Sequence, residues 1–277
     1  MEFLSAPLTY IVILANIIIS FTGFKNASFI EKTLFRTDKI LKNQQYGRIV
    51  SSGFIHGDWG HLFFNMFTLY SFGTSLEMMY GSLFFGGVYF FSLIGGNLLS
   101  LYLHRNQPDF ASLGASGAVN GILFSSILVF PGMEVMMFLI PVGIPGWLFA
   151  ILYTVYSMYA LKSQSDNVGH DAHLGGAIIG TLVTVAFFPN LATEKWMILS
   201  AILIPGIAFI YILSQHPQIM GFEKGIITKK RKPEVLDHQG QIRAEKASEF
   251  KRIVEKIESS GRESLNDYEQ RFFDMNK

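Results

Sequence analysis

Long stretches of this chain carry no charged residue, and they constrain the fold more than any other feature. Asp, Glu, Lys and Arg are absent from residues 82–103, 110–133, 135–161, 174–193 and 196–222. A helix needs about 20 predominantly apolar residues to cross the hydrocarbon core of a bilayer. Several of these segments reach that length, so the sequence predicts an all-α, multi-pass integral membrane protein.

The apolar segments predict a bundle of six core transmembrane helices and a seventh after them. The expected helices are residues 8–24, 61–80, 82–103, 114–130, 146–162, 170–188 and 196–213. Residues 25–52 mix basic and aromatic side chains, which is typical of a loop at the membrane interface. Pro141 and Pro145 favour a loop over a helix in residues 133–146. We therefore expect a catalytic membrane domain in residues 1–190 and a seventh transmembrane helix within 191–222.

The C-terminal part has a different composition. More than half of the charged residues follow residue 222, so residues 223–277 are expected to form a soluble, charged tail. Residues 244–259 have the apolar spacing of an amphipathic helix, which Gly261 would end. The pattern Ser264-x-x-Asp267 suggests the cap of a second short helix. A solvated appendage and a docking module are both compatible with this tail.

Composition excludes several classes of function. The formal net charge of +1 offers no basic surface for nucleic acid. The absence of cysteine excludes disulfides, thiolate metal sites and a cysteine nucleophile. The first apolar run has neither a basic segment before it nor a small-residue cleavage site after it, so we expect it to be retained as a helix.

Ser116 lies among small residues at the start of the fourth expected helix, in the run Gly114-Ala115-Ser116-Gly117. One interpretation is helix packing, because small residues let transmembrane helices approach closely. The other is a nucleophile at a helix start, where backbone N–H groups without helical partners can receive an oxyanion. The run alone favours packing, and residues elsewhere in the chain decide between the two.

His173 supplies a partner for this serine. Gly117 and Gly121 share one face of the fourth helix, and Ala172, Gly176 and Gly180 share one face of the sixth. Alternating helices make the fourth and sixth parallel, and their small faces permit close contact. Ser116 and His173 then lie at the same depth, where His173 can act as the general base for Ser116 without a third carboxylate.

His61 and Asn65 extend the set to a third parallel helix. They are four residues apart at the start of the second expected helix and so share a face. If that face points toward Ser116, an imidazole N–H and an amide NH₂ become donors for a developing oxyanion. A polar contact between helices is the alternative for each residue alone, but four residues converging at one depth favour catalysis.

Other chemistries fit the sequence poorly. His56, His61, His170 and His173 lack the H-E-x-x-H spacing of helical zinc proteases, so we expect no metal and no cofactor. The aspartates near the helices lie at or beyond their ends, which excludes a pair of intramembrane catalytic carboxylates. A transporter would be expected to show an internal repeat, and none is visible between the two halves.

These residues together resemble the rhomboid intramembrane serine proteases. The resemblance covers about residues 8–188 and rests on motifs that occur in the same order as in that family: His56-x-x-x-Gly60-His61-x-x-x-Asn65, Gly114-Ala115-Ser116-Gly117 and Ala172-His173-Leu174-Gly175-Gly176. It implies that Ser116 is the nucleophile, His173 the base, and His61 and Asn65 the oxyanion donors. Supporting roles are implied for His56, Gly114, Gly117 and Glu77.

The resemblance also implies partners and a location. Substrates would be transmembrane proteins cut in or near the bilayer, entering beside the fifth helix, with the Pro141–Gly146 segment as a mobile cap. The tail is similar to modules attached to some bacterial rhomboids, which favours a bacterial inner membrane. The sequence departs from the family at Asn120, where an aromatic residue commonly packs on the catalytic imidazole. The alternative function is a catalytically silent rhomboid-like protein that binds membrane clients.

Overall fold

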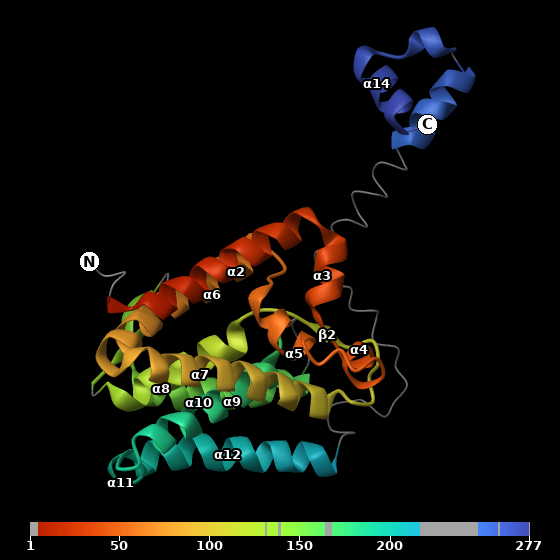
Figure 1. Cartoon of the computed structure of the whole chain (residues 1–277). Helices are drawn as coiled ribbons and strands as arrows, with labels where there is room; N and C mark the ends of the chain where they lie inside the picture. Colours follow the sequence, from red (N-terminus) through yellow and green to blue (C-terminus); the bar gives the residue numbers. More distant parts are fainter. Residues whose placement is uncertain are drawn as a thin grey trace. The chain divides into compact units, whose positions relative to one another are not determined.

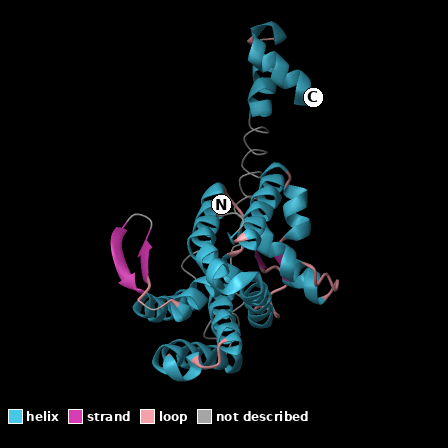
Figure 2. Ribbon diagram, turned by 60° about the vertical axis from the view of Figure 1, so that its left-hand side comes forward, coloured by secondary structure: helices cyan, strands magenta, loops and turns pink. Residues whose placement is uncertain are grey.

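The computed structural model describes residues 5–130, 132–137, 140–163, 168–216, 249–259 and 261–276. The chain divides into two compact units, Met1–Arg231 and Lys232–Lys277. The described part of the first unit is a bundle of helices, and strands are confined to two short pairs (Figures 1 and 2). The prediction of an all-α membrane bundle is therefore confirmed.

The long helices lie where the uncharged segments predicted them. Their bounds are α2 Pro7–Lys25, α6 Trp59–Thr68, α7 Thr74–Leu103, α8 Ser116–Val129, α9 Gly146–Ser163, α10 His170–Phe187 and α12 Trp196–Gln215. A π-helical turn, Leu69–Gly73, joins α6 to α7. Gly81 breaks α7 with a φ of 83°, so the expected second and third transmembrane helices meet at this glycine.

Length and hydropathy single out three described stretches as able to cross a bilayer: Pro7–Lys25, Trp59–Leu103 and Trp196–Gln215. The apolar helix α8 is shorter, with 14 residues. At 1.5 Å per residue it is about 21 Å long, less than the roughly 30 Å of a hydrocarbon core. Every residue of α8 after Ser116 is buried, so the protein itself surrounds this short helix.

Helices α8 and α10 pack as a parallel pair through the predicted small faces. A Cβ atom added to Gly180 would lie 2.5 Å from the Cα of Gly121, and one added to Gly176 would overlap the carbonyl oxygen of Gly117. Further along the pair, the Thr184 hydroxyl donates to Ser125 Oγ at 2.7 Å. The pairing of residues 117, 121 and 125 with 176, 180 and 184 sets the relative depth of the two helix starts.

The predicted interfacial loop contains short helices: α3 Ala27–Thr33, α4 Thr37–Leu41, α5 Arg48–Ser51 and the 3₁₀ turn Ser52–Phe54. Strand β1, Phe35–Arg36, pairs antiparallel with β2, Ala111–Ser112. The Arg48 guanidinium donates to the carbonyl oxygens of Leu34 and Glu31 at 2.7 and 2.8 Å. The loop is thereby tied to itself and to the link that leads into α8.

The expected loop between the fourth and fifth helices is a β-hairpin of β3, Glu134–Met137, and β4, Ile140–Pro145 (Figure 2). The proposed cap, Pro141–Gly146, is wrong in position. It follows the C-terminal end of α8, where the Gly146 N–H donates to the Met133 carbonyl at 2.7 Å. Ser116 begins the same helix, so the length of α8 separates the two.

Glu77 connects α7 to the start of α2. Its carboxylate accepts from the backbone N–H groups of Leu8 and Thr9 at 2.9 and 2.6 Å and from the Thr9 hydroxyl at 2.7 Å. These N–H groups belong to the first helical turn and have no partner within α2. The Ser82 hydroxyl, just beyond Gly81, donates to the same carboxylate at 2.5 Å. Glu77 therefore fixes the junction of three helical segments.

The second unit contains a helix of residues 249–259, a 3₁₀ turn Arg262–Ser264 and α14, Asp267–Asn276. Ile253, Leu265 and Phe272 form its small core. The expected cap at Ser264 is wrong, because the Asn266 side chain accepts from the Glu269 N–H at 2.8 Å. The Glu269 carboxylate accepts from the Asn266 N–H at 3.1 Å, which completes a capping box.

Candidate active site

The side chains of Ser116 and His173 meet at the start of the parallel pair. Ser116 is the first residue of α8, and His173 lies in the first turn of α10. The Oγ atom of Ser116 is 2.6 Å from Nε2 of His173. Both residues are partly exposed, whereas Ala115, Gly117, Ala172 and Leu174 beside them are buried. The serine–histidine pair is therefore hydrogen-bonded and open on one side.

Gly114 creates the turn that delivers Ser116. Its φ of 121° is a conformation that only glycine adopts readily, and its N–H donates to the Ser52 carbonyl at 2.9 Å. A Cβ atom at this position would lie 2.7 Å from two atoms of the His61 ring. Gly114 is thus required both by the backbone and by the imidazole that packs on it.

The His61 ring packs on Gly114, two residues before Ser116. Asp58 begins α6 by accepting a hydrogen bond from the His61 N–H at 2.8 Å. The buried Asn65 lies one turn further along α6, and its Nδ2 donates to the His61 carbonyl at 2.9 Å. Only one of the two Asn65 amide hydrogens is used in this bond, so the second can serve another acceptor.

His56 supports the turn from behind. The Ala115 N–H donates to His56 Nε2 at 3.4 Å, and Nδ1 lies 2.9 Å from Ser20 Oγ. Nε2 must therefore be unprotonated, and Nδ1 carries the hydrogen. Burial, and then the neighbouring His61, lower the pKa of His56 to about 3. His56 is consequently a neutral acceptor that holds the residue before Ser116.

Gly117 and Glu77 act on the fold around the site. A Cβ atom at Gly117 would lie 3.2 Å from the Ala172 carbonyl, so this glycine permits the approach of α10 next to His173. Glu77 lies in the first turn of α7 and binds the start of α2, as described above. The structure therefore brings Ser116, His173, His61, His56, Gly114 and Gly117 together and places Glu77 elsewhere.

Tyr153 of α9 is a site residue that the sequence reasoning missed. Its hydroxyl oxygen lies 3.0 Å from Nδ1 of His173, on the far side of the imidazole from Ser116. The ring is held between aromatic neighbours, with centroids 5.6 Å from Phe149 and 5.9 Å from Phe124. Tyrosines recur at three-residue spacing along α9, at 153, 156 and 159, so the sequence did not single out this one among them.

The site contains ionisable groups but no metal-binding arrangement among the described residues. No group of three or more His, Cys, Asp and Glu side chains in that part of the chain is placed to hold a metal ion. Asp171, two residues before His173, points away and lies 3.0 Å from His104.

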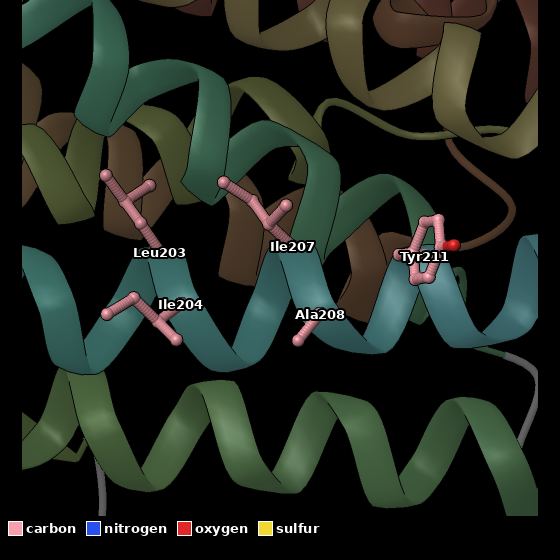
Figure 3. A pocket seen from close by; sticks show the side chains of 5 residues that line it. All are labelled: Leu203, Ile204, Ile207, Ala208 and Tyr211. Carbon is pink, nitrogen blue, oxygen red and sulfur yellow. The ribbon is translucent and has the colours of Figure 1, made fainter.

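An apolar groove lies along α12, away from these residues in the sequence (Figure 3). It has a volume of about 440 Å³ and is lined by Leu203, Ile204, Ile207, Ala208 and Tyr211.

Known proteins resemble part of this chain. Rhomboid protein 1, mitochondrial, of Saccharomyces cerevisiae is 36% identical over 150 residues, which cover 53% of this chain and 43% of the yeast protein. Rhomboid protease AarA of Providencia stuartii is 31% identical over 157 residues, covering 48% of this chain and 53% of that protein. Rhomboid protease GluP of Bacillus subtilis is 27% identical over 179 residues, covering 64% and 33%.

The chain thus spans about half the length, or less, of these relatives. A family model described as the Rhomboid domain matches residues 43–190, which is more than half of the chain. This range includes every residue from α5 to α10, and hence both Ser116 and His173. On that match the chain belongs to the rhomboid family.

Proposed function

We propose that this protein is an intramembrane serine endopeptidase that hydrolyses peptide bonds in or near the transmembrane segments of other membrane proteins. The observation that carries the proposal is the 2.6 Å contact between Ser116 Oγ and His173 Nε2 at a partly exposed position. A serine is a weak nucleophile unless an adjacent base takes its proton, and an imidazole within hydrogen-bond reach is such a base.

The reaction follows from this geometry. Ser116 Oγ attacks the scissile carbonyl carbon while its proton passes to His173 Nε2. The protonated His173 then gives that proton to the departing amine, and an acyl-Ser116 ester forms. A water molecule, deprotonated by His173, attacks the ester, and His173 returns that proton to Ser116 Oγ as the carboxylic acid product leaves. The dyad needs no third carboxylate, and the nearby Asp171 is already paired with His104.

Stabilisation of the oxyanion is assigned to donors around the start of α8. The first N–H groups of a helix have no intrahelical acceptor and are available to a negatively charged oxygen. His61 packs on Gly114, and Asn65 retains an amide hydrogen that its bond to His61 does not use. Losing one such donor in other serine proteases costs roughly 10²–10³-fold in kcat.

The shortness of α8 supports a cleavage site within the membrane. A helix about 21 Å long in a bilayer core of roughly 30 Å leaves at least one of its ends below the membrane surface. If that end is the start of α8, Ser116 is recessed, and transmembrane segments are the substrates that can reach it. Water must also reach Ser116, so we expect a hydrophilic cavity that opens toward one membrane face.

The membrane and the substrates remain assigned by resemblance alone. Family resemblance suggests substrates with small residues at the cleaved bond and helix-weakening residues beyond it. Matching relatives include a mitochondrial protein of yeast and proteases of two bacteria. This distribution does not support a bacterial inner membrane over other membranes, and that location stays a prediction.

The test is cleavage of a fluorescent transmembrane substrate by the purified full-length protein in liposomes. Wild-type protein is expected to cut it, and Ser116→Ala is expected to abolish cleavage while leaving the thermal unfolding midpoint unchanged. Ser126→Ala is the matched control, because Ser126 lies on the same helix and its hydroxyl donates to the Ile122 carbonyl of that helix instead of contacting His173. Binding of the substrate without cleavage by the wild type would favour the client-binding alternative.

A further inference from the structure

Asn120 and Tyr153 occupy the place where the sequence departs from the pattern of the family. Asn120 lies one turn after Ser116 on α8, and its Nδ2 donates to the Ser116 carbonyl at 2.9 Å. The Asn120 side chain also contributes a hydrogen bond to the Tyr153 hydroxyl oxygen, as does the Ser157 side chain. Tyr153 in turn contacts Nδ1 of His173 at 3.0 Å. The two residues therefore link the backbone of Ser116 to the far side of its histidine.

The hydrogens in this network can be assigned in one consistent direction. For His173 Nε2 to accept the Ser116 proton, the neutral imidazole must carry its hydrogen on Nδ1. That N–H donates to the tyrosine oxygen, which leaves the tyrosine O–H to donate onward. Nδ2 of Asn120 carries two hydrogens, so the one that Ser116 does not use can donate to the tyrosine oxygen, and the Ser157 hydroxyl can accept the tyrosine proton. The hydrogen-bond network thus runs from the Ser116 hydroxyl through His173 to Tyr153, and Asn120 connects it to the Ser116 carbonyl.

The opposite assignment fails at the serine. If Nδ1 accepted from the Tyr153 hydroxyl, a neutral imidazole would carry its hydrogen on Nε2, facing Ser116 Oγ. Nε2 could then not take the serine proton. The identity of the Nδ1 partner thus matters for reactivity, because it selects which tautomer is present. The Tyr153 oxygen can accept because the Ser157 hydroxyl is available for the tyrosine proton.

We propose that Tyr153, itself oriented by Asn120, is a positioning residue that holds His173 in the tautomer and ring orientation needed to activate Ser116. This inference rests on the proposed function. In related sequences an aromatic residue at the position of Asn120 commonly packs on the imidazole. In this chain Tyr153, on a different helix, supplies the aromatic neighbour of His173. It also makes α9 a part of the site, since α8 carries the nucleophile, α10 the base and α9 the group that orients the base.

The packing around Tyr153 supports a fixed orienting group. Its ring lies against Phe149 of the same helix and Phe124 of α8, so the hydroxyl has little freedom to turn away from His173. A hydroxyl held in place before the reaction loses no conformational entropy when the imidazole becomes protonated. Replacing only this oxygen leaves the aromatic contacts intact, which makes Tyr153→Phe a clean probe.

The experiment compares steady-state cleavage by full-length wild type, Tyr153→Phe, Asn120→Leu and the double variant in liposomes. Tyr153→Phe should lower kcat about tenfold, as expected for losing one orienting hydrogen bond, with KM within twofold and an unchanged unfolding midpoint. Asn120→Leu should lower kcat about threefold. The double variant should be no slower than Tyr153→Phe, because both changes interrupt one chain. Tyr159→Phe, an exposed tyrosine on the same helix, is the matched control.

Other results would overturn the proposal. An unchanged kcat for Tyr153→Phe would mean that His173 needs no partner at Nδ1. Losses that multiply in the double variant would mean that Asn120 acts independently of Tyr153. In both cases the wild type is active, so the proposed function stands. A folded wild type that neither cleaves the substrate nor reacts with a fluorophosphonate would overturn the proposed function and this inference with it.

Discussion

Two polar clusters lie at the start of α10, two residues apart and on different sides of the helix. In the first, His173 contacts Ser116 and Tyr153 and is partly exposed. In the second, Asp171 lies 3.0 Å from His104, and their side chains are 3% and 8% exposed. Both clusters pair an imidazole with an oxygen. Access separates them, because only the first can meet a substrate.

The buried cluster of Asp171 and His104, here called the closed cluster, helps to position the partly exposed cluster of Ser116, His173 and Tyr153. His104 Nδ1 lies 2.8 Å from the Gln107 side-chain oxygen, and its ring stacks on Phe110 with centroids 3.5 Å apart. Gln107 and Phe110 belong to the link that runs from α7 to Ser116. The buried pair therefore fastens that link to α10. Polar groups at membrane depth are costly unless satisfied, so the closed cluster is expected to contribute to stability rather than to the reaction.

The largest expected effect separates the clusters by activity. His173→Ala should lower the cleavage rate about 10³-fold, because Ser116 loses its base. Its unfolding midpoint should stay near that of the wild type, since His173 is already partly exposed. Cleavage in liposomes and thermal unfolding in detergent measure the two quantities. If His173→Ala instead lowered the unfolding midpoint while the folded variant kept the wild-type cleavage rate, His173 would have a structural role and not a catalytic one.

Asp171→Ala should give the opposite pattern. Removing one partner of a buried hydrogen-bonded pair leaves the other unsatisfied and costs about 1–3 kcal/mol of unfolding free energy. Any activity loss should follow the folded fraction. The exposed Asp109, on the same link as Gln107, provides the control Asp109→Ala, which should change stability by less than about 0.5 kcal/mol. Equal stability of the two variants would contradict the role given to the closed cluster.

The close glycine contacts between α8 and α10 can be tested by adding a methyl group through a Gly→Ala substitution. Gly180→Ala places a Cβ atom 2.5 Å from the backbone of Gly121, so α8 and α10 must separate. Overpacking of this kind costs about 1–3 kcal/mol. Gly87→Ala is the control, because its nearest neighbour is an aromatic side chain at 3.6 Å. Chemical unfolding of both variants measures the difference, and cleavage should fall only in Gly180→Ala.

A smaller effect concerns pH. The pKa of His56 is about 3 in the folded protein, because of burial and then His61, and 6.5 is its ordinary value. As pH falls below 6.5, His56 becomes protonated in the unfolded chain but stays neutral in the folded protein. Stability is therefore full above pH 6.5 and declines toward pH 3, by about 2 kcal/mol at pH 5.

Unfolding midpoints at pH 7.5 and 5.0 test this, with His56→Gln as the comparison. Glutamine keeps an acceptor for the Ala115 N–H but does not titrate, so its stability should change less over this range. The pKa of Glu269 is lowered to about 2, mainly by hydrogen bonds from Lys256 and the Asn266 backbone. The stability it contributes is constant above about pH 4.5 and is lost only below that pH, so it does not interfere. An identical decline in both proteins would rule out His56 as the source.

Much of the fold was predictable because a bilayer imposes strong rules on sequence. Helices of membrane length cannot carry charges facing lipid, so the uncharged segments predicted the long helices α2, α7, α8, α9, α10 and α12. Glycines at four-residue spacing predicted the contact between α8 and α10, since only small residues allow that approach. Once those helices were parallel, the meeting of Ser116 and His173 followed from their positions at the two helix starts.

The errors arose where sequence distance and spatial distance differ. Tyr153 belongs to a helix with aromatic residues on all sides, so its direction depends on packing that no periodicity encodes. Pro141–Gly146 immediately precedes the fifth helix, yet the length of α8 places it away from Ser116. In the tail, Ser264 and Asn266 are both good capping residues, and local backbone geometry selects Asn266.

The most direct test of the central claim is covalent labelling of Ser116, because it needs no knowledge of the substrate. A fluorophosphonate reacts only with an activated serine, and peptide mass mapping locates the adduct. The account predicts that wild-type protein in liposomes carries the label on Ser116, and that His173→Ala lowers the labelling rate at least about 100-fold. Folded wild-type protein with no adduct at Ser116, or with equal labelling in the absence of His173, would contradict it.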